Sequence, residues 1–335
     1  MINWRRAARQ ALAKDYPHHD ILVLGSWTAR ISSDRRNYID FLRAHFRQEA
    51  AASSTVESGA QIRLVHCGPG HPLFADNGEI PEDTMDVKSL GKRQIAVATR
   101  LLRAIAAGEP GREEITMFLL GDTADDCVLT THFSVAFRRV LLEFGLFYLH
   151  AGAVERNASV SLFIGEKGAG KSTVCLRLAQ EGGRLLSDDH VLVKRRRGRY
   201  LVSGSDRIAR ITSDTERFLF RRPLEIEARD FAGTAKKEFA TAALFHCSPF
   251  QDHPIQNVFF PRVGREFSIR PISEGTATLR LLAGNKHGLR FTDRKDYESF
   301  LGFFSGMVAG KRIFDMELSP DPADLNQLVA FLRNG

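Results

Sequence analysis

The chain has 335 residues, of which 43% are hydrophobic and 26% charged, as in an ordinary globular protein of about two domains. No apolar run approaches the ~20 residues of a membrane-spanning helix, and the opening segment lacks the apolar core of a signal peptide, so we expect a cytoplasmic protein. The 47 basic against 40 acidic side chains give a net charge of +7, which favours acidic or phosphorylated partners.

The first third of the chain is predicted to form an α+β domain. Apolar runs between turn residues predict strands, and apolar residues three or four apart predict helices. The predicted elements are a strand over 21–24, a helix over 37–46, a strand over 61–66 and an Ala/Leu-rich helix over 94–107 that ends at Gly108. A boundary is expected within 85–115, which divides the chain into a smaller domain, 1–110, and a larger domain, 111–335.

The larger domain is predicted to alternate strands and helices. The patterns predict a strand over 115–120, an amphipathic helix over 132–144, a strand over 160–164, a helix from Lys171, a hairpin over 192–202 and a final helix over 321–332. The hairpin has a basic tip, 194–199. The tip is expected to be a solvated turn, with an acidic or nucleic-acid partner as the alternative. Nucleic acid is not expected, because no repeated aromatic residues accompany the charges.

The cysteines give no metal or disulfide pattern. The four of them, Cys67, Cys127, Cys175 and Cys247, lie far apart and include no C-x-x-C pair, so reduced thiols are expected. His66, Cys67 and His71 lack a fourth ligand at a standard spacing, and no structural zinc is expected.

A glycine-rich sequence carries the clearest chemical signal. Residues 165–173, GEKGAGKST, fit the pattern G-x-x-x-x-G-K-[ST] between a predicted strand and a predicted helix. Glycines allow backbone amides to point at phosphate oxygens, Lys171 can reach the β- and γ-phosphates, and the Ser172 hydroxyl can ligate Mg²⁺. The expected nucleotide-binding residues are Gly165, Lys167, Gly168, Ala169, Gly170, Lys171, Ser172 and Thr173. The alternative is a turn that binds nothing.

Two adjacent acids follow the helix after this sequence. A short apolar run, 184–187, leads directly into Asp188 and Asp189, where a metal-holding carboxylate is expected. One acid can hold the metal while the other accepts a proton from an attacking hydroxyl. The alternative is a solvated turn.

These segments together resemble the HPr kinase/phosphorylase family, which is related to phosphoenolpyruvate carboxykinase. The resemblance rests on LHAGAV at 149–154, on the glycine-rich sequence and on RLLSDD at 184–189. It is strongest over 146–192. In that family a histidine lies one strand before the glycine-rich loop, which corresponds to His150, and a double Asp follows the loop's helix.

The resemblance implies a mixed-sheet α/β fold and transfer of the γ-phosphoryl group of ATP to a serine hydroxyl with Mg²⁺. It assigns catalytic roles to Lys171, His150 and Asp188, with Asp188 as the base, and metal binding to Ser172 and Asp189; the two aspartates can exchange roles. Hexamers in the family make a homo-oligomer an expectation.

The chain also departs from the bifunctional family members. Thr173 stands where they usually carry Glu, and no Pro-Gly-Arg-Asn-type segment follows. The sequence is therefore more similar to divergent, peptide-tailoring serine kinases, such as those that act on lasso-peptide precursors. A peptide or protein acceptor is expected, and the domain 1–110 is the candidate for recognising it.

Two other functions remain open from sequence. One is a kinase of the same fold with a small-molecule acceptor, and the other is a nucleotide-binding switch. Secondary candidates for contact with phosphate are Lys236 or Lys237, because the divergent relatives carry a basic residue in about this place, and more weakly Arg262 and Arg265. The alternative for Lys236 and Lys237 is a solvated charged turn.

Overall fold

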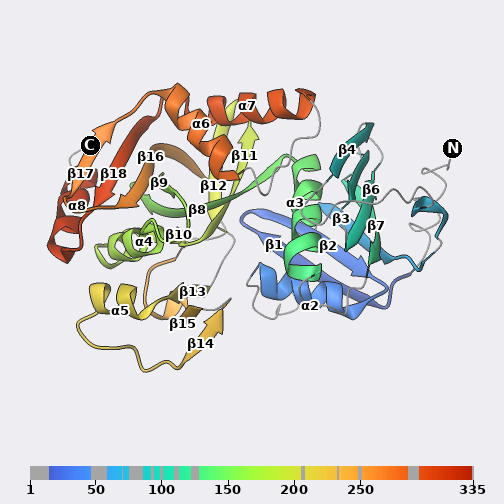
Figure 1. Cartoon of the computed structure of the whole chain (residues 1–335), viewed down its shortest axis with the longest axis horizontal. Coiled ribbons are helices and arrows are strands. Elements are labelled where there is room, and N and C mark those ends of the chain that lie inside the picture. Colours follow the sequence, from blue (N-terminus) through green and yellow to red (C-terminus); the bar gives the residue numbers. More distant parts are fainter. Residues whose placement is uncertain are drawn as a thin grey trace. The chain divides into compact units, whose positions relative to one another are not determined.

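The computed structural model divides the chain into two compact units (Figure 1). The first comprises Met1–Phe147 with Lys286–Glu298, and the second comprises Tyr148–Asn285 with Ser299–Gly335. The structure describes residues 15–46, 59–69, 71–74, 86–91, 94–98, 101–108, 113–121, 128–204, 208–231, 234–247, 251–285 and 294–333. None of the helices in these ranges is long and apolar enough to cross a membrane.

The first unit contains a seven-stranded mixed sheet in the order β1-β2-β3-β7-β6-β5-β4. Its strands are β1 (His18–Leu24), β2 (Trp27–Ser33), β3 (Ala60–His66), β4 (Asp86–Gly91), β5 (Gln94–Ala98), β6 (Leu102–Ala107) and β7 (Glu114–Gly121). Strands β2, β3 and β7 are parallel neighbours, and the other pairings are antiparallel.

Two helices of this unit meet in an aromatic cluster. Helix α2 (Arg36–His45) buries Tyr38, and α3 (Ser134–Glu143), preceded by a π-helical turn (Val128–Phe133), buries Phe137. The Tyr38 and Phe133 ring centroids lie 5.2 Å apart, within the range of favourable aromatic pairs. The strands predicted over 21–24, 61–66 and 115–120 and the helices predicted over 37–46 and 132–144 are confirmed within one to three residues at each end.

The helix predicted over 94–107 is wrong. This segment contains strands β5 and β6, paired antiparallel with Ile95 opposite Ala106. Alanine and leucine favour a helix in isolation, but the pairing of β6 with β7 and the burial of Ile95 and Val97 stabilise the sheet instead.

The division between the units also differs from the predicted boundary at residue 110. Strand β7 pairs with both β3 and β6, so it lies inside the first sheet. The helix α3 belongs to the same unit, and the division falls between Phe147 and Tyr148. The strands before and after this sequence signal, β6 and β7, pair with each other in one sheet, and residues 109–111 lie outside the described residues.

The second unit is built on an eight-stranded mixed sheet. Its order is β10-β8-β11-β12-β16-β18-β17, and β9 pairs with β8 and β16. The strands are β8 (Leu146–Arg156), β9 (Ser159–Ile164), β10 (Arg184–Ser187), β11 (His190–Arg196), β12 (Arg199–Gly204), β16 (His253–Val263), β17 (Ser268–Pro271) and β18 (Arg312–Leu318). The helices are α4 (Lys171–Gln180), α6 (Glu274–Asn285), the part of α7 (Arg294–Val308) from Ser299 onward, and α8 (Leu325–Arg333).

A smaller three-stranded sheet is attached to this unit. Its order is β13-β15-β14, with β13 (Ile208–Ile211), β14 (Ala228–Phe231) and β15 (Thr234–Ala240). The short helix α5 (Ser213–Leu219) follows β13 and is capped by the Thr212 side chain, which accepts from the Thr215 amide.

Parallel strands set the position of the glycine-rich loop. Strands β9, β16 and β18 run in the same direction, so their carboxyl ends meet at one edge of the sheet. Stacked rings of Phe163 and Phe259, 5.2 Å apart, and of Phe259 and Phe314, also 5.2 Å apart, hold the three strands together. Ligands of open α/β sheets bind at this kind of edge.

Candidate active site

The loop between β9 and α4 has a backbone that requires glycine. Gly168 has φ 86° and Gly170 has φ 91°, in the left-handed region that other residues rarely adopt. At Gly170 a Cβ atom would in addition collide with the Cδ1 of Leu318. Gly170 is the N-cap of α4 and offers no capping side chain. The first amides of this helix, at Lys171, Ser172 and Thr173, therefore have no intrahelical acceptor and form an anion-binding terminus.

Lys171 folds back into the loop that precedes it. Its Nζ donates hydrogen bonds to the carbonyl oxygens of Gly165, at 2.8 Å, and Glu166, at 2.9 Å. The side chain is buried, and this burial lowers the pKa of Lys171, while the negative charge of Asp189 acts in the opposite direction. These hydrogen bonds hold the ammonium group against the backbone at the start of the glycine-rich loop.

The two aspartates occupy different environments. Asp188 is only 2% exposed, and its backbone carbonyl accepts a hydrogen bond from the Ser172 hydroxyl at 3.3 Å. The Ser187 hydroxyl accepts from the amides of Asp189 and His190, which fixes the turn between β10 and β11. Asp189 lines the open cavity described below, whereas Asp188 does not.

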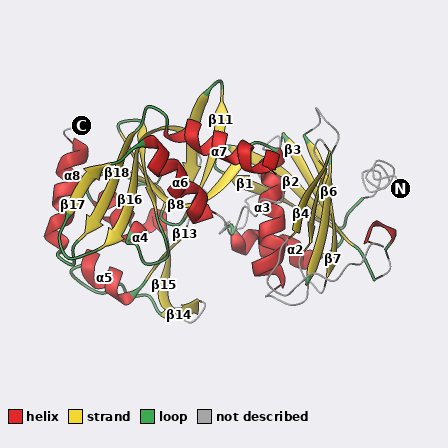
Figure 2. Cartoon of the chain, turned by 45° about the horizontal axis from the view of Figure 1, so that its top comes forward, coloured by secondary structure: helices red, strands yellow, loops and turns green. Residues whose placement is uncertain are grey.

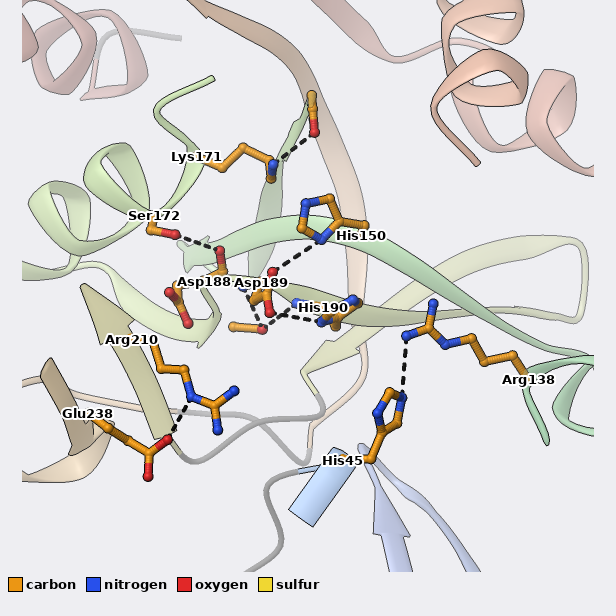
Figure 3. Close-up of polar contacts among 12 residues, drawn as sticks. His45, Arg138, His150, Lys171, Ser172, Asp188, Asp189, His190, Arg210 and Glu238 are labelled. Atoms are coloured by element: carbon orange, nitrogen blue, oxygen red, sulfur yellow. Dashed lines mark hydrogen bonds and ion pairs between the residues drawn. The ribbon is translucent and has the colours of Figure 1, made fainter. Parts of the chain in front are cut away.

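Asp189 lies between two histidines. Its Oδ1 is 3.1 Å from Nδ1 of His150, on β8, and its Oδ2 is 3.1 Å from Nδ1 of His190, at the start of β11 (Figure 3). The His190 ring also stacks on Tyr148 at 4.7 Å. The two imidazoles fix the orientation of the carboxylate. One ligand atom from each of His150, Asp189 and His190 lies within 4.8 Å of the others, so these residues are also able to hold a metal ion.

His190 was missed by the sequence analysis. It directly follows the double Asp, and Tyr148 and His150 are two residues apart, so both project from the same face of β8. Since β8 and β11 are neighbours in the sheet, this spacing was the available signal.

The glycine-rich loop opens on a cavity of about 680 Å³, a size typical of small-ligand sites. Of the residues predicted for the site, those that line it are Lys167, Gly168, Gly170, Lys171, Ser172, Thr173, His150 and Asp189. Gly165, Ala169 and Asp188 do not. Apolar residues from other elements also line the cavity, namely Phe218, Val263, Leu318, Pro320 and Leu325.

The three-stranded sheet contributes two basic side chains to the cavity, of which only Lys236 was a candidate from the sequence. Arg210 and Lys236 both line the cavity, and Arg210 is held by Glu238, with Nε 2.6 Å from Oε2 (Figure 3). Arg210 lies in β13 within no recognisable sequence pattern. The side chain of Lys237 pairs with Glu216 at 2.9 Å instead, because neighbouring residues of a strand project to opposite faces. Arg262 pairs with Glu317 and does not line the cavity.

The described cysteines are free thiols. Cys67 and Cys175 are buried and Cys247 is partly buried, while Cys127 lies outside the described residues. Burial raises the pKa of Cys67 to about 11. Cys175 packs beneath the site, where a Cβ atom on Gly152 would collide with its Sγ. These thiols fill space and carry no charge at neutral pH.

Comparisons with known proteins find a distant likeness among solved structures. No family model matches the chain, and no curated protein matches it. Among solved structures, it is similar to the Hpr(Ser) kinase/phosphatase from Coxiella burnetii, with 13% sequence identity and a TM-score of 0.27. The match covers 56% of this chain and 99% of that one. At this TM-score the likeness carries no argument about activity.

Proposed function

We propose that the protein is an ATP-dependent kinase that transfers the γ-phosphoryl group to a serine hydroxyl of a peptide or protein. The observation that carries this proposal is the arrangement of Lys171 and the uncapped α4 amides around a cavity that also contains Asp189. Amides, a buried cation and a carboxylate together supply phosphate binding and proton acceptance, which are the two requirements of phosphoryl transfer to an alcohol.

The nucleotide phosphates would lie against the α4 terminus and Lys171. Lys236 and Arg210, at the cavity wall, add positive charge where the transferred group carries its negative charge. The apolar residues that line the cavity suit a nucleotide base. Ser172 and the neighbouring carboxylates offer the oxygen ligands that Mg²⁺ prefers, and the ion would neutralise phosphate charge.

The burial of the two aspartates favours the exchanged assignment of their roles. A base must touch the acceptor hydroxyl, and Asp189 lines the cavity whereas Asp188 is buried next to Ser172. We assign the role of proton acceptor to Asp189, which His150 orients, and the binding of Mg²⁺ to Asp188 and Ser172. The acceptor oxygen forms a bond to the γ-phosphorus, the bond to the β-phosphate oxygen breaks, the proton passes to Asp189, and ADP leaves.

The test is transfer of labelled γ-phosphate from ATP, with Mg²⁺, to serine-containing peptides. We expect phosphoserine formation by the full chain and none by Lys171→Ala, with both proteins equally folded. Release of phosphate to water alone, unchanged by any hydroxyl acceptor, would contradict the kinase and favour a nucleotide switch. Transfer by Lys171→Ala at the wild-type rate would refute the role of the loop.

A further inference from the structure

The β11–β12 hairpin presents a dense group of arginines. It projects from its sheet as a two-stranded arm (Figure 2), and Arg195, Arg196, Arg197 and Arg199 at its end are all exposed. Lys194, at the base of this group, pairs with Asp252 at 2.6 Å. Among the described residues, no carboxylate forms an ion pair with the four arginines, which we call the arginine tip.

The arginine tip is unfavourable for hairpin formation in two ways. Arg197 and Gly198 have φ values of 50° and 77°, as in a type I′ turn, where Asn-Gly is favoured and arginine has no advantage. Arg196 and Arg199 are direct cross-strand partners, and like charges in that position repel. Departures from local preference of this kind are typical of functional sites rather than of a neutral surface turn.

The backbone of the arm is well supported, which sets where along the arm each arginine is attached. Six residue pairs connect β11 and β12, from Val191–Gly204 to Arg196–Arg199. Val193 and Val202 are fully buried, and Tyr200 packs edge-on against Phe303 with centroids 5.1 Å apart. The Arg195 guanidinium lies 5.8 Å from the Tyr200 ring, a cation–π contact that orders it.

The other end of the arm is the candidate active site. Strand β11 begins at His190, directly after Asp189. At about 3.3 Å per residue, the seven steps along the strand from Asp189 to Arg196 span roughly 23 Å. An extended peptide with its serine at Asp189 would reach the arginine tip with about seven residues.

We propose that the arginine tip binds an acidic stretch of the peptide acceptor, about six to eight residues from the serine that is phosphorylated. This inference rests on the proposed kinase function. Arginine forks pair bidentately with carboxylates, which gives the tip affinity for Glu- and Asp-rich segments. Single-stranded nucleic acid is the weaker candidate, because Tyr200 is 9% exposed and no exposed aromatic ring lies within the tip for a base to stack on.

The first experiment measures binding of a fluorescein-labelled octaglutamate peptide to the full chain by anisotropy. Replacing all four tip arginines by Gln should weaken binding by on the order of tenfold or more, and added salt should weaken wild-type binding. The matched control replaces four exposed arginines elsewhere in the same unit, Arg221, Arg222, Arg229 and Arg270, and should leave binding nearly unchanged.

A single substitution separates binding from folding. Arg197→Asn creates the favoured Asn-Gly turn, so we expect Tm to rise by about 1–2 °C while octaglutamate binding weakens. Equal weakening in the control variant, unchanged binding in the tip variant, or tighter binding of an eight-residue oligo-dT than of octaglutamate would overturn the proposal.

A transfer assay links the arginine tip to catalysis. Peptides with one serine and four glutamates placed two, seven or twelve residues away should be phosphorylated best at a spacing of seven, and the tip variant should lose this preference through KM. Equal KM values at all three spacings would contradict the proposed role. ATP binding by the tip variant should match wild type, since no tip residue lines the cavity. Absence of ATP binding by the wild type would instead refute the kinase, whatever the octaglutamate result.

Discussion

At the residue scale, Gly168 and Gly170 provide a matched pair. Both have positive φ, but only at Gly170 would a Cβ atom meet a packed side chain, that of Leu318. We expect Gly168→Ala to cost about 1–2 kcal/mol in free energy of unfolding, from backbone strain alone. Gly170→Ala should cost more, as measured by urea denaturation. In a Leu318→Ala background this excess should disappear; a constant difference in both backgrounds would refute the steric explanation.

We expect substitutions of the two aspartates to change the kinetics in different ways. Asp189→Asn should lower kcat by about 10²–10⁴-fold with ATP binding kept, because it removes the proton acceptor. Asp188→Asn should raise the Mg²⁺ concentration needed for half-maximal activity. Steady-state kinetics at varied ATP and Mg²⁺ measure both. If instead Asp188→Asn lowers kcat and Asp189→Asn raises the Mg²⁺ requirement, Asp188 is the proton acceptor.

At the element scale, strand β15 presents adjacent lysines to two environments. Lys237 lies against Glu216, whose side chain is 8% exposed, and its hydrogen bond lowers the pKa of Glu216. Lys237→Met would leave a buried carboxylate without its cation, so we expect a loss of about 3–5 kcal/mol in free energy of unfolding. Lys236→Met should change stability by less than about 0.5 kcal/mol, but should raise KM for ATP.

The sign of the pH effect follows from the lowered pKa of Glu216. A carboxyl group whose pKa is lower in the folded state contributes stability above its unfolded pKa and loses it as pH falls through the folded pKa. The difference in free energy of unfolding between wild type and Lys237→Met should therefore have its largest value at pH 7 and decrease below about pH 4.5. Denaturation at a series of pH values measures it, and a difference independent of pH would exclude the ion pair as its cause.

The element scale also shows where sequence patterns succeed and fail. The strand–loop–helix at β9 and α4 was predicted closely, because its glycines and flanking apolar residues act locally. The strands in 94–107 were not predicted, because the alanines of this segment are compatible with a helix or a strand. Strand structure is favoured by pairing with β7, which comes later in the chain.

At the scale of the whole molecule, the division at Phe147 predicts which fragments fold. A chain starting at residue 111 carries β7 and α3 without the other six strands of their sheet, so we expect it to aggregate through unpaired strand edges. A chain starting at Gly145 omits the whole sheet and should remain in solution and bind ATP. Expression, size-exclusion chromatography and ATP titration of both fragments test this; a folded 111–335 fragment would contradict the observed division.

The sequence by itself determined the features that depend on neighbouring residues. The glycine-rich loop, the start of α4, the double Asp and the basic hairpin all follow from local spacing and backbone preference. Only the tertiary structure decided that Asp189 lines the cavity while Asp188 is buried, that His190 joins His150 around it, and that Lys236 rather than Lys237 lines the cavity. These outcomes depend on strand neighbours and burial, which long-range pairing sets and which no local pattern encodes.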